Sequence, residues 1–122
     1  MSKKNSKTKG SQSERIAVDF LLEKGYQILE KNFRCSKKEI DIIAKKDNVI
    51  SFIEVKSKNE NVNFNLEYSI TASKQKSIFE VANYYVEKNN VIDTEFSFDV
   101  IFVKFIKGEI EIEHFENSFQ YY

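Results

Sequence analysis

The sequence predicts an α/β domain in which a mixed β-sheet carries a helix on each side. Its amphipathic segments follow the order helix, three strands, helix, two strands, which is α-β-β-β-α-β-β. Two of the strand-like runs are separated by a tight-turn dipeptide, which indicates a hairpin. The chain has 122 residues, 41% of them hydrophobic, which suffices for one core and is too little for two. We therefore expect a single domain.

The first helix is expected over residues 11–24, because apolar residues recur at helical spacing from Ile16 to Leu21 and Gly25 then supplies a stop. Residues 1–10 carry four lysines and no acidic residue, so we expect a disordered basic tail there and a single domain over residues 11–122. An irregular first strand is expected over residues 26–33.

The next two strands are expected to form a β-hairpin over residues 39–44 and 49–56, with Asp47-Asn48 as its turn. A two-residue loop pairs Lys46 with Val49 and fixes the register. Asp41 then lies opposite Glu54. A four-residue loop would shift the pairing by two residues and leave the same acids on one face of the sheet.

The remaining elements follow from composition and spacing. Residues 57–70 are polar and rich in asparagine, so we expect a loop. Thr71 is a plausible N-cap for a second helix that runs to about Lys88. A strongly β-prone strand follows over residues 96–105. Lys107-Gly108 makes a turn, and residues 109–115 alternate acid and isoleucine as an edge strand with one wet face does.

The strongest chemical signal is the pair Asp41 and Glu54, followed by Lys56, on apolar strands. Opposed carboxylates repel, so a cation should offset them, and the candidates are Lys56 and a metal ion. Two oxygen ligands suit Mg²⁺ or Mn²⁺, which lowers the pKa of a bound water. A nearby lysine can orient or deprotonate the attacking water. The competing interpretation is a structural ion-pair ladder in which Glu39 pairs with Lys56.

Other residues carry weaker signals. Glu14 could reach the charged face as a further metal ligand, or could close a capping box with Ser11. Lys74 and Gln75 could contact a phosphate backbone, although an ordinary solvated helix face is locally the better explanation. Asp99 lies in an apolar run and needs a partner. His114 is the only histidine, which essentially excludes zinc clusters and catalytic triads.

Cellular context follows from charge and cysteine usage. Formal net charge is zero, which by itself is not typical of a nucleic-acid binder. The single cysteine, Cys35, permits no internal disulfide and is most simply a small packed residue. No segment has the length and apolar character of a membrane span or signal peptide, so we expect a cytoplasmic protein without a membrane partner.

These residues together resemble the uncharacterised bacterial YraN-like family. The resemblance covers about residues 10–103 and includes Glu-Arg-Ile-Ala at 14–17, Lys-Gly-Tyr at 24–26, Asn-Phe-Arg-Cys at 32–35, Glu-Ile-Asp ending at Asp41, Glu-Val-Lys starting at Glu54, Lys74-Gln75 and Phe-Asp-Val around Asp99. That family is similar to the PD-(D/E)xK, restriction-endonuclease-like superfamily, and within it to archaeal Holliday-junction resolvases and RecB-type nuclease domains.

The resemblance implies a restriction-endonuclease-like fold and a metal-dependent endonuclease that hydrolyses phosphodiesters in DNA, including branched DNA. It implies Glu14, Asp41 and Glu54 as ligands of Mg²⁺ or Mn²⁺ and Lys56 as the catalytic lysine. Gln75 resembles the helix glutamine of the RecB-type motif, and Lys58 stands where the family has an arginine. Nucleases that cut two strands often act as dimers, so a homodimer is compatible with this hypothesis.

Two alternatives stay open. Ser97 stands where the family has arginine, and Lys38 where it usually has glycine, so positive charge around the site has thinned or moved. Together with the neutral charge, this favours a nucleic-acid-binding module with a nuclease fold and no turnover. The acidic last strand and the aromatic end at 119–122 instead favour a protein-interaction domain, which truncation after Glu116 would test.

Overall fold

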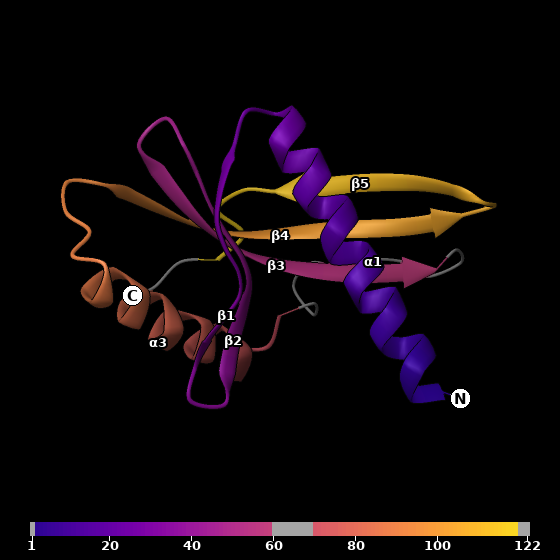
Figure 1. The fold of residues 1–122 in the computed structure, drawn as a ribbon, viewed down its shortest axis with the longest axis horizontal. Helices are drawn as coiled ribbons and strands as arrows, with labels where there is room; N and C mark the ends of the chain where they lie inside the picture. Colours follow the sequence, from indigo (N-terminus) through magenta and orange to yellow (C-terminus); the bar gives the residue numbers. More distant parts are fainter. Residues whose placement is uncertain (1, 60–69, 120–122) are drawn as a thin grey trace.

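The computed structural model describes residues 2–59 and 70–119. Its elements follow one another in the predicted order, and Figure 1 shows their arrangement. They are α1 (Ser2–Glu23), β1 (Gln27–Cys35), β2 (Lys38–Lys46), β3 (Val49–Asn59), α3 (Ala72–Lys88), β4 (Glu95–Ile106) and β5 (Glu109–Phe115).

One sheet joins the five strands of the described residues in the order β1-β2-β3-β4-β5. Strands β3 and β4 are parallel, whereas the other neighbouring pairs are antiparallel. The parallel pair arises because α3 carries the chain back from the end of β3 to the start of β4. The predicted fold class, a mixed sheet flanked by helices, is confirmed.

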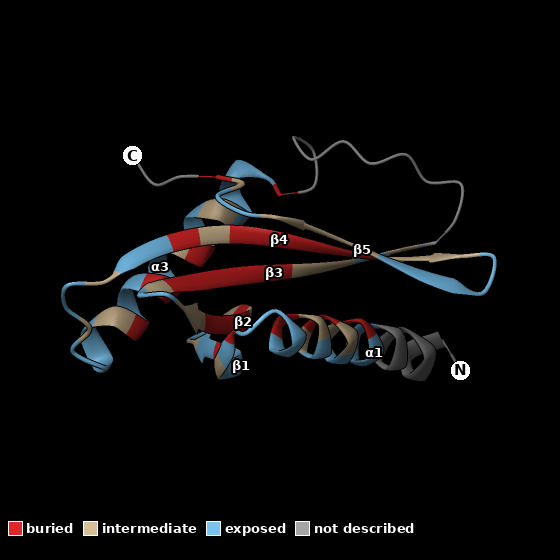
Figure 2. Cartoon of the chain, turned by 90° about the horizontal axis from the view of Figure 1, so that it is seen from above, coloured by how far each residue is buried: buried red, intermediate tan, exposed pale blue. Residues whose placement is uncertain are grey.

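The two helices cover opposite faces of the sheet, as Figures 1 and 2 show. Ala17 and Leu21 of α1 pack with Ile53 and Ile101 in one buried cluster, which we call the α1-side core. A second buried cluster, the α3-side core, joins α3 to the other face. Its central members are Ile43, Phe52, Ile78, Val81, Tyr85, Val100 and Phe102. Because neighbouring residues of a strand point to opposite faces, each strand feeds both cores alternately.

The hairpin of β2 and β3 has the predicted turn and register. Asp47 and Asn48 both have left-handed backbone angles, with φ of 50° and 61°, as a two-residue type I′ turn requires. Lys46 pairs with Val49. The predicted irregularity of the first strand is a register shift between Ile28 and Glu30.

The main difference from expectation is the start of α1, which begins at Ser2 and not at Ser11. The backbone is therefore helical where we expected a disordered tail. Lysine is a good helix former and no proline interrupts the segment. Once Ala17 and Leu21 fix the following turns on the sheet, each added residue costs little because the helix nucleus already exists.

The ends of the second half also differ in detail. β3 continues to Asn59, because β4 offers ladder partners as far as the pair Asn59 and Phe105. The rest of the expected loop, residues 60–69, lies outside the described residues. Thr71 is the N-cap of α3 and accepts a hydrogen bond from the Lys74 amide, as predicted.

β5 is an edge strand, as its alternating sequence predicts, and Ile110 on it is 49% exposed. The aromatic end is not an exposed tail throughout, because Phe119 is buried in the α3-side core. Truncation after Glu116 would therefore remove part of the core, so it cannot test association cleanly. Among the described residues, no helix is long and apolar enough to cross a membrane.

Candidate active site

The candidate site begins where β2 separates from β3. The ladder between these strands runs from the turn to the pair Ile42 and Ile53, and Asp41 is the next residue of β2 away from the turn. The Asp41 Oδ2 atom accepts a hydrogen bond of 2.8 Å from the Val55 amide. Ile40 and Ile42 belong to cores on opposite faces, although two residues apart, so the strand rotates around Asp41. The predicted direct pair of Asp41 and Glu54 is thus replaced by a side-chain-to-backbone contact that keeps the two acids adjacent.

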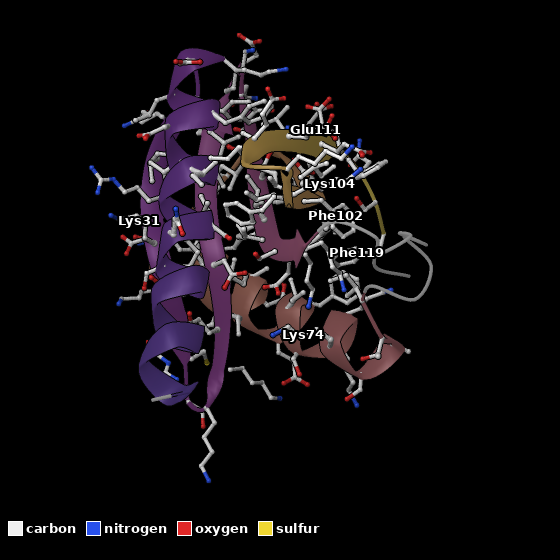
Figure 3. The ribbon with its side chains drawn as sticks, turned by 90° about the vertical axis from the view of Figure 1, so that its right-hand side faces the viewer. Lys31, Lys74, Phe102, Lys104, Glu111 and Phe119 are labelled. Carbon is white, nitrogen blue, oxygen red and sulfur yellow. The ribbon has the colours of Figure 1, made fainter. Side chains whose placement is uncertain are left out.

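Glu54 lies on the sheet face that α3 covers. Its neighbour in the parallel register is Val100, which packs in the α3-side core. The Glu54 side chain is buried, at 4% exposure for the residue, and its Oε1 atom has no hydrogen-bond partner within residues 2–59 and 70–119. Its Oε2 atom lies 3.7 Å from the Lys74 ammonium, which projects from the first turn of α3 (Figure 3). A buried carboxylate oxygen without a donor is a free ligand atom for a cation.

Burial and mutual repulsion disfavour the charged forms of both acids. Burial, followed by repulsion from Asp41, raises the pKa of Glu54 to about 7 against the attraction of Lys74 and Lys56. Burial raises the pKa of Asp41 to about 6, although the Val55 amide opposes this rise. The pair therefore holds its full negative charge only when a nearby cation offsets it.

Glu14 reaches this region from α1. Its Oε1 atom accepts a hydrogen bond of 2.9 Å from Asn32, whose side chain also donates to Glu39 at 2.8 Å. The capping-box alternative is wrong, because α1 begins at Ser2 and Ser11 lies inside the helix. Glu14 is close enough to repel Asp41 and raise its pKa.

The three predicted metal ligands do not form a compact group. Among the described residues, a single set of three metal-binding side chains has all its ligand atoms within 4.8 Å of one another, and that set is not Glu14, Asp41 and Glu54. The site is therefore a close pair of acids, Asp41 and Glu54, with Glu14 nearby and tethered through Asn32.

The predicted cations take up different positions. Lys56 follows Glu54 by two residues on the same strand, and the alternation of strand side chains places it on the same face. It also lowers the pKa of Glu54 by attraction. Lys58 is half-buried one step further along β3. Gln75 donates to the Ile70 carbonyl at 3.2 Å, so it anchors the start of α3. The assignment of Lys74, Gln75 and Lys58 to nucleic-acid binding stays a prediction.

Glu39 pairs with Arg34, and not with Lys56 as the competing ion-pair ladder required. Glu39 lies 3.3 Å from Arg34 of the neighbouring strand and accepts the hydrogen bond from Asn32. Lys56 is thereby left on the same face as the two acids, where the metal-site hypothesis needs a cation.

Sequence reasoning missed two features here. Lys74 was assigned to phosphate contact, whereas its nearest acid is Glu54. Asn32 was not singled out, yet it connects Glu14 to Glu39. Its backbone φ of 51° lies in the left-handed region, which asparagine tolerates better than most residues. An asparagine inside a strand pattern was the available signal.

A hollow of about 430 Å³ opens beside Glu14. Its lining includes Arg15 and Lys31 as well as Asn32. The same lining includes the acids Glu14 and Asp19, so this hollow is mixed in charge, and the cation in contact with Glu54 is Lys74 of α3. Cys35 is half-buried against the α3-side core, in agreement with its expected packing role.

Comparison with known proteins places the chain in a family. The model of "Uncharacterised protein family UPF0102" matches residues 13–103, which run from the second half of α1 through most of β4. The chain belongs to UPF0102. A UPF0102 protein of Clostridioides difficile (strain 630) is 47% identical over 116 residues, covering 94% of this chain and 99% of the relative.

Other UPF0102 members are similarly close. One from Clostridium perfringens (strain 13 / Type A) is 48% identical over 103 residues, covering 84% of each chain. One from Caldanaerobacter subterraneus subsp. tengcongensis is 41% identical over 123 residues, covering 98% of this chain and 100% of the relative. The family resemblance inferred from the sequence is confirmed. The names of these relatives state no activity.

Proposed function

We propose that this UPF0102 protein is a metal-dependent endonuclease-like protein that hydrolyses phosphodiester bonds in DNA. The observation that carries the proposal is the pair of half-buried Asp41 and buried Glu54, with a Glu54 oxygen that has no partner among the described residues and with Lys56 on the same face. Two acids whose pKa values are raised together, beside a lysine, are costly for folding and therefore point to chemistry.

The residues present fit a hard divalent cation. Asp41 and Glu54 would hold Mg²⁺ or Mn²⁺ through carboxylate oxygens, and Glu14 would join them only by leaving its hydrogen bond to Asn32. A bound cation of this kind lowers the pKa of a water and offsets negative charge on a phosphate. The fit rests on the orphaned Glu54 Oε1 atom, which has a ligand's chemistry and no donor.

The remaining side chains would position the reactants. Lys56 would orient the attacking water or, as the uncharged amine, accept its proton, because it lies on the same face of β3 as Glu54. Lys74 would exchange its contact with Glu54 for one with a DNA phosphate, since its side chain is flexible and 43% exposed. The hollow beside Glu14 offers two further cations, Arg15 and Lys31, although Asp19 lines it as well.

Cleavage of a labelled DNA panel tests the proposal. The panel contains a four-way junction, a flap, a linear duplex and a single strand, each with Mg²⁺, Mn²⁺ or EDTA. Wild type is compared with Asp41→Asn and Lys56→Ala. Lys24→Ala is the matched control, because Lys24 lies ten residues beyond Glu14, about 15 Å along the direction of α1.

Metal-dependent products that both site variants lose and the control retains are the expected result. Activity of Lys56→Ala equal to wild type would remove the assigned role of this lysine. The preferred substrate in the panel would show whether branched DNA is favoured over linear DNA.

A nucleic-acid-binding module without turnover is the second candidate. The observation that favours it is the spacing of the acids, because Glu14, Asp41 and Glu54 do not bring their ligand atoms within 4.8 Å of one another. This candidate predicts salt-sensitive DNA binding that EDTA leaves unchanged, and no metal-dependent product. Sustained cleavage by wild type, lost in Asp41→Asn, would exclude it.

A further inference from the structure

A second polar centre lies on the other face of the sheet, beneath α1. Asp99 neighbours Ile53 in the parallel register, and Ile53 packs in the α1-side core. Glu54 neighbours Val100, which packs in the α3-side core. Since neighbours in register point the same way, Asp99 and Glu54 face opposite sides of the sheet. The centre around Asp99 is therefore separate from the candidate active site.

Asp99 is fully buried and held through both of its oxygens. Its Oδ1 atom accepts hydrogen bonds from the Ser97 hydroxyl and, at 3.2 Å, from the Asn117 amide. Its Oδ2 atom lies 2.8 Å from His114 Nε2. His114 reaches Asp99 from β5, the strand that pairs with β4. The His114 ring also lies against the ring of Phe20 in α1.

Glu116 completes the group from the turn after β5. Its Oε1 atom accepts a hydrogen bond of 3.1 Å from the Tyr26 hydroxyl. One ligand atom each from Asp99, His114 and Glu116 can be chosen so that all lie within 4.8 Å of one another, the single such group among the described residues.

We propose that Asp99, His114 and Glu116 form a binding site for a zinc-class divalent cation. One imidazole and two carboxylates are donors that Zn²⁺ accepts at about 2.0–2.2 Å, and three such ligands around one ion fall within the observed spacing. Each carboxylate is also oriented from outside the group. Ser97 and the Asn117 amide hold Asp99, and Tyr26 holds Glu116, as outer-shell donors do around metal sites.

A hollow of about 650 Å³ adjoins the group through Glu116 and through the outer-shell residues Tyr26, Ser97 and Asn117, whereas Asp99 and His114 do not line it. A cation would therefore enter past Glu116, and a fourth ligand such as water would come from that side. A single histidine excludes zinc sites that are built from several histidines. Here carboxylates from β4 and from the turn after β5 would complete the ligand set around one histidine.

The two centres differ in donor chemistry, so one experiment separates them. The chain without a histidine tag, carrying Asp41→Asn and Glu54→Gln, is stripped with a chelator and titrated with Zn²⁺ by calorimetry. Binding of Co²⁺, followed by visible absorption, reports the ligands around the ion. Glu116→Gln removes the exposed member of the group and is expected to fold. Glu111→Gln is the matched control, an exposed acid on β5 that lies far from α3 (Figure 3).

We expect one equivalent of Zn²⁺ to bind the Asp41→Asn, Glu54→Gln chain. Glu116→Gln should weaken this binding at least about tenfold, and Glu111→Gln should leave it unchanged. Thermal unfolding should show the same order, with Zn²⁺ raising the melting temperature except in Glu116→Gln. Absence of Zn²⁺ binding, or equal binding by Glu116→Gln and its parent, would overturn the proposal and identify Asp99 and His114 as an ion pair only. Because the active-site acids are already replaced, neither outcome depends on nuclease activity.

Discussion

Replacing Glu54 by glutamine should stabilise the protein at pH 8 and change its stability little at pH 4.5. The Glu54 pKa rises from 4.5 in the unfolded chain to about 7 in the fold, mainly because the side chain is buried and lies beside Asp41. Between these values the folded protein binds more protons than the unfolded chain, so its free energy of unfolding falls as pH rises. The stability associated with protonated Glu54 is thus fully present below pH 4.5 and lost as pH rises through 7.

The magnitude follows from the size of this pKa change. Each unit of pKa corresponds to about 1.4 kcal/mol, so ionising Glu54 in the fold costs on the order of 3 kcal/mol. Glutamine has nearly the same shape and carries no charge. Lys74 would lose its acidic partner, but its side chain is 43% exposed and stays hydrated. We therefore expect Glu54→Gln to be more stable than wild type by roughly 2–3 kcal/mol at pH 8.

Urea unfolding followed by circular dichroism checks this expectation at pH values from 4.5 to 8, with EDTA present so that bound cations do not contribute. The curve of unfolding free energy against pH should be flatter for Glu54→Gln than for wild type. The exposed edge-strand substitution Glu111→Gln is the control and should follow wild type. Parallel curves for wild type and Glu54→Gln would refute the reasoning that Glu54 is held in a costly ionised state.

Three further outcomes are expected. Mg²⁺ should bind more tightly as pH rises through 6 and 7, because Asp41 and Glu54 must first lose protons. Calorimetry in two buffers of different ionisation enthalpy should detect the released proton. Constant Mg²⁺ affinity from pH 5.5 to 8 would contradict this expectation. Lys74→Ala should lower the slope of log DNA affinity against log salt by about one, whereas Lys24→Ala should not. Asp99→Ala should destabilise the fold by about 3 kcal/mol or more in urea, because its three donors lose their acceptor, and a loss below 1 kcal/mol would show that they find other partners.

The local part of the site could be predicted from the sequence. Asp47-Asn48 selects a two-residue turn and the turn sets the register as far as Ile42 and Ile53, which leaves Asp41 next to the stretch that holds Glu54 and Val55. Each step depends on neighbours in the chain, so one sequence suffices. The alternation of strand side chains then places Lys56 on the same face as Glu54.

Contacts between distant elements could not be predicted in this way. The approach of Lys74 to Glu54 depends on how α3 packs across the sheet, and helical periodicity gives only the buried face of that helix. The partnership of Asp99 and His114 depends on the register between β4 and β5. Asp99 was correctly expected to need a partner, but no local rule selects a histidine fifteen residues away.

The neutral net charge of the chain is a weak argument against DNA binding, because the charge at the site changes when a cation binds. Asp41 and Glu54 place negative charge where a phosphate would approach, and Lys74 is drawn to Glu54. A divalent cation held by the two acids would cancel their charge and leave Lys56 and Lys74 to face the DNA. Cation and DNA should then each strengthen the binding of the other by the same factor. Ca²⁺, a hard cation with oxygen ligands, should therefore raise DNA affinity over that in EDTA in wild type and not in Asp41→Asn. Equal DNA affinity with and without the cation would separate DNA binding from this site.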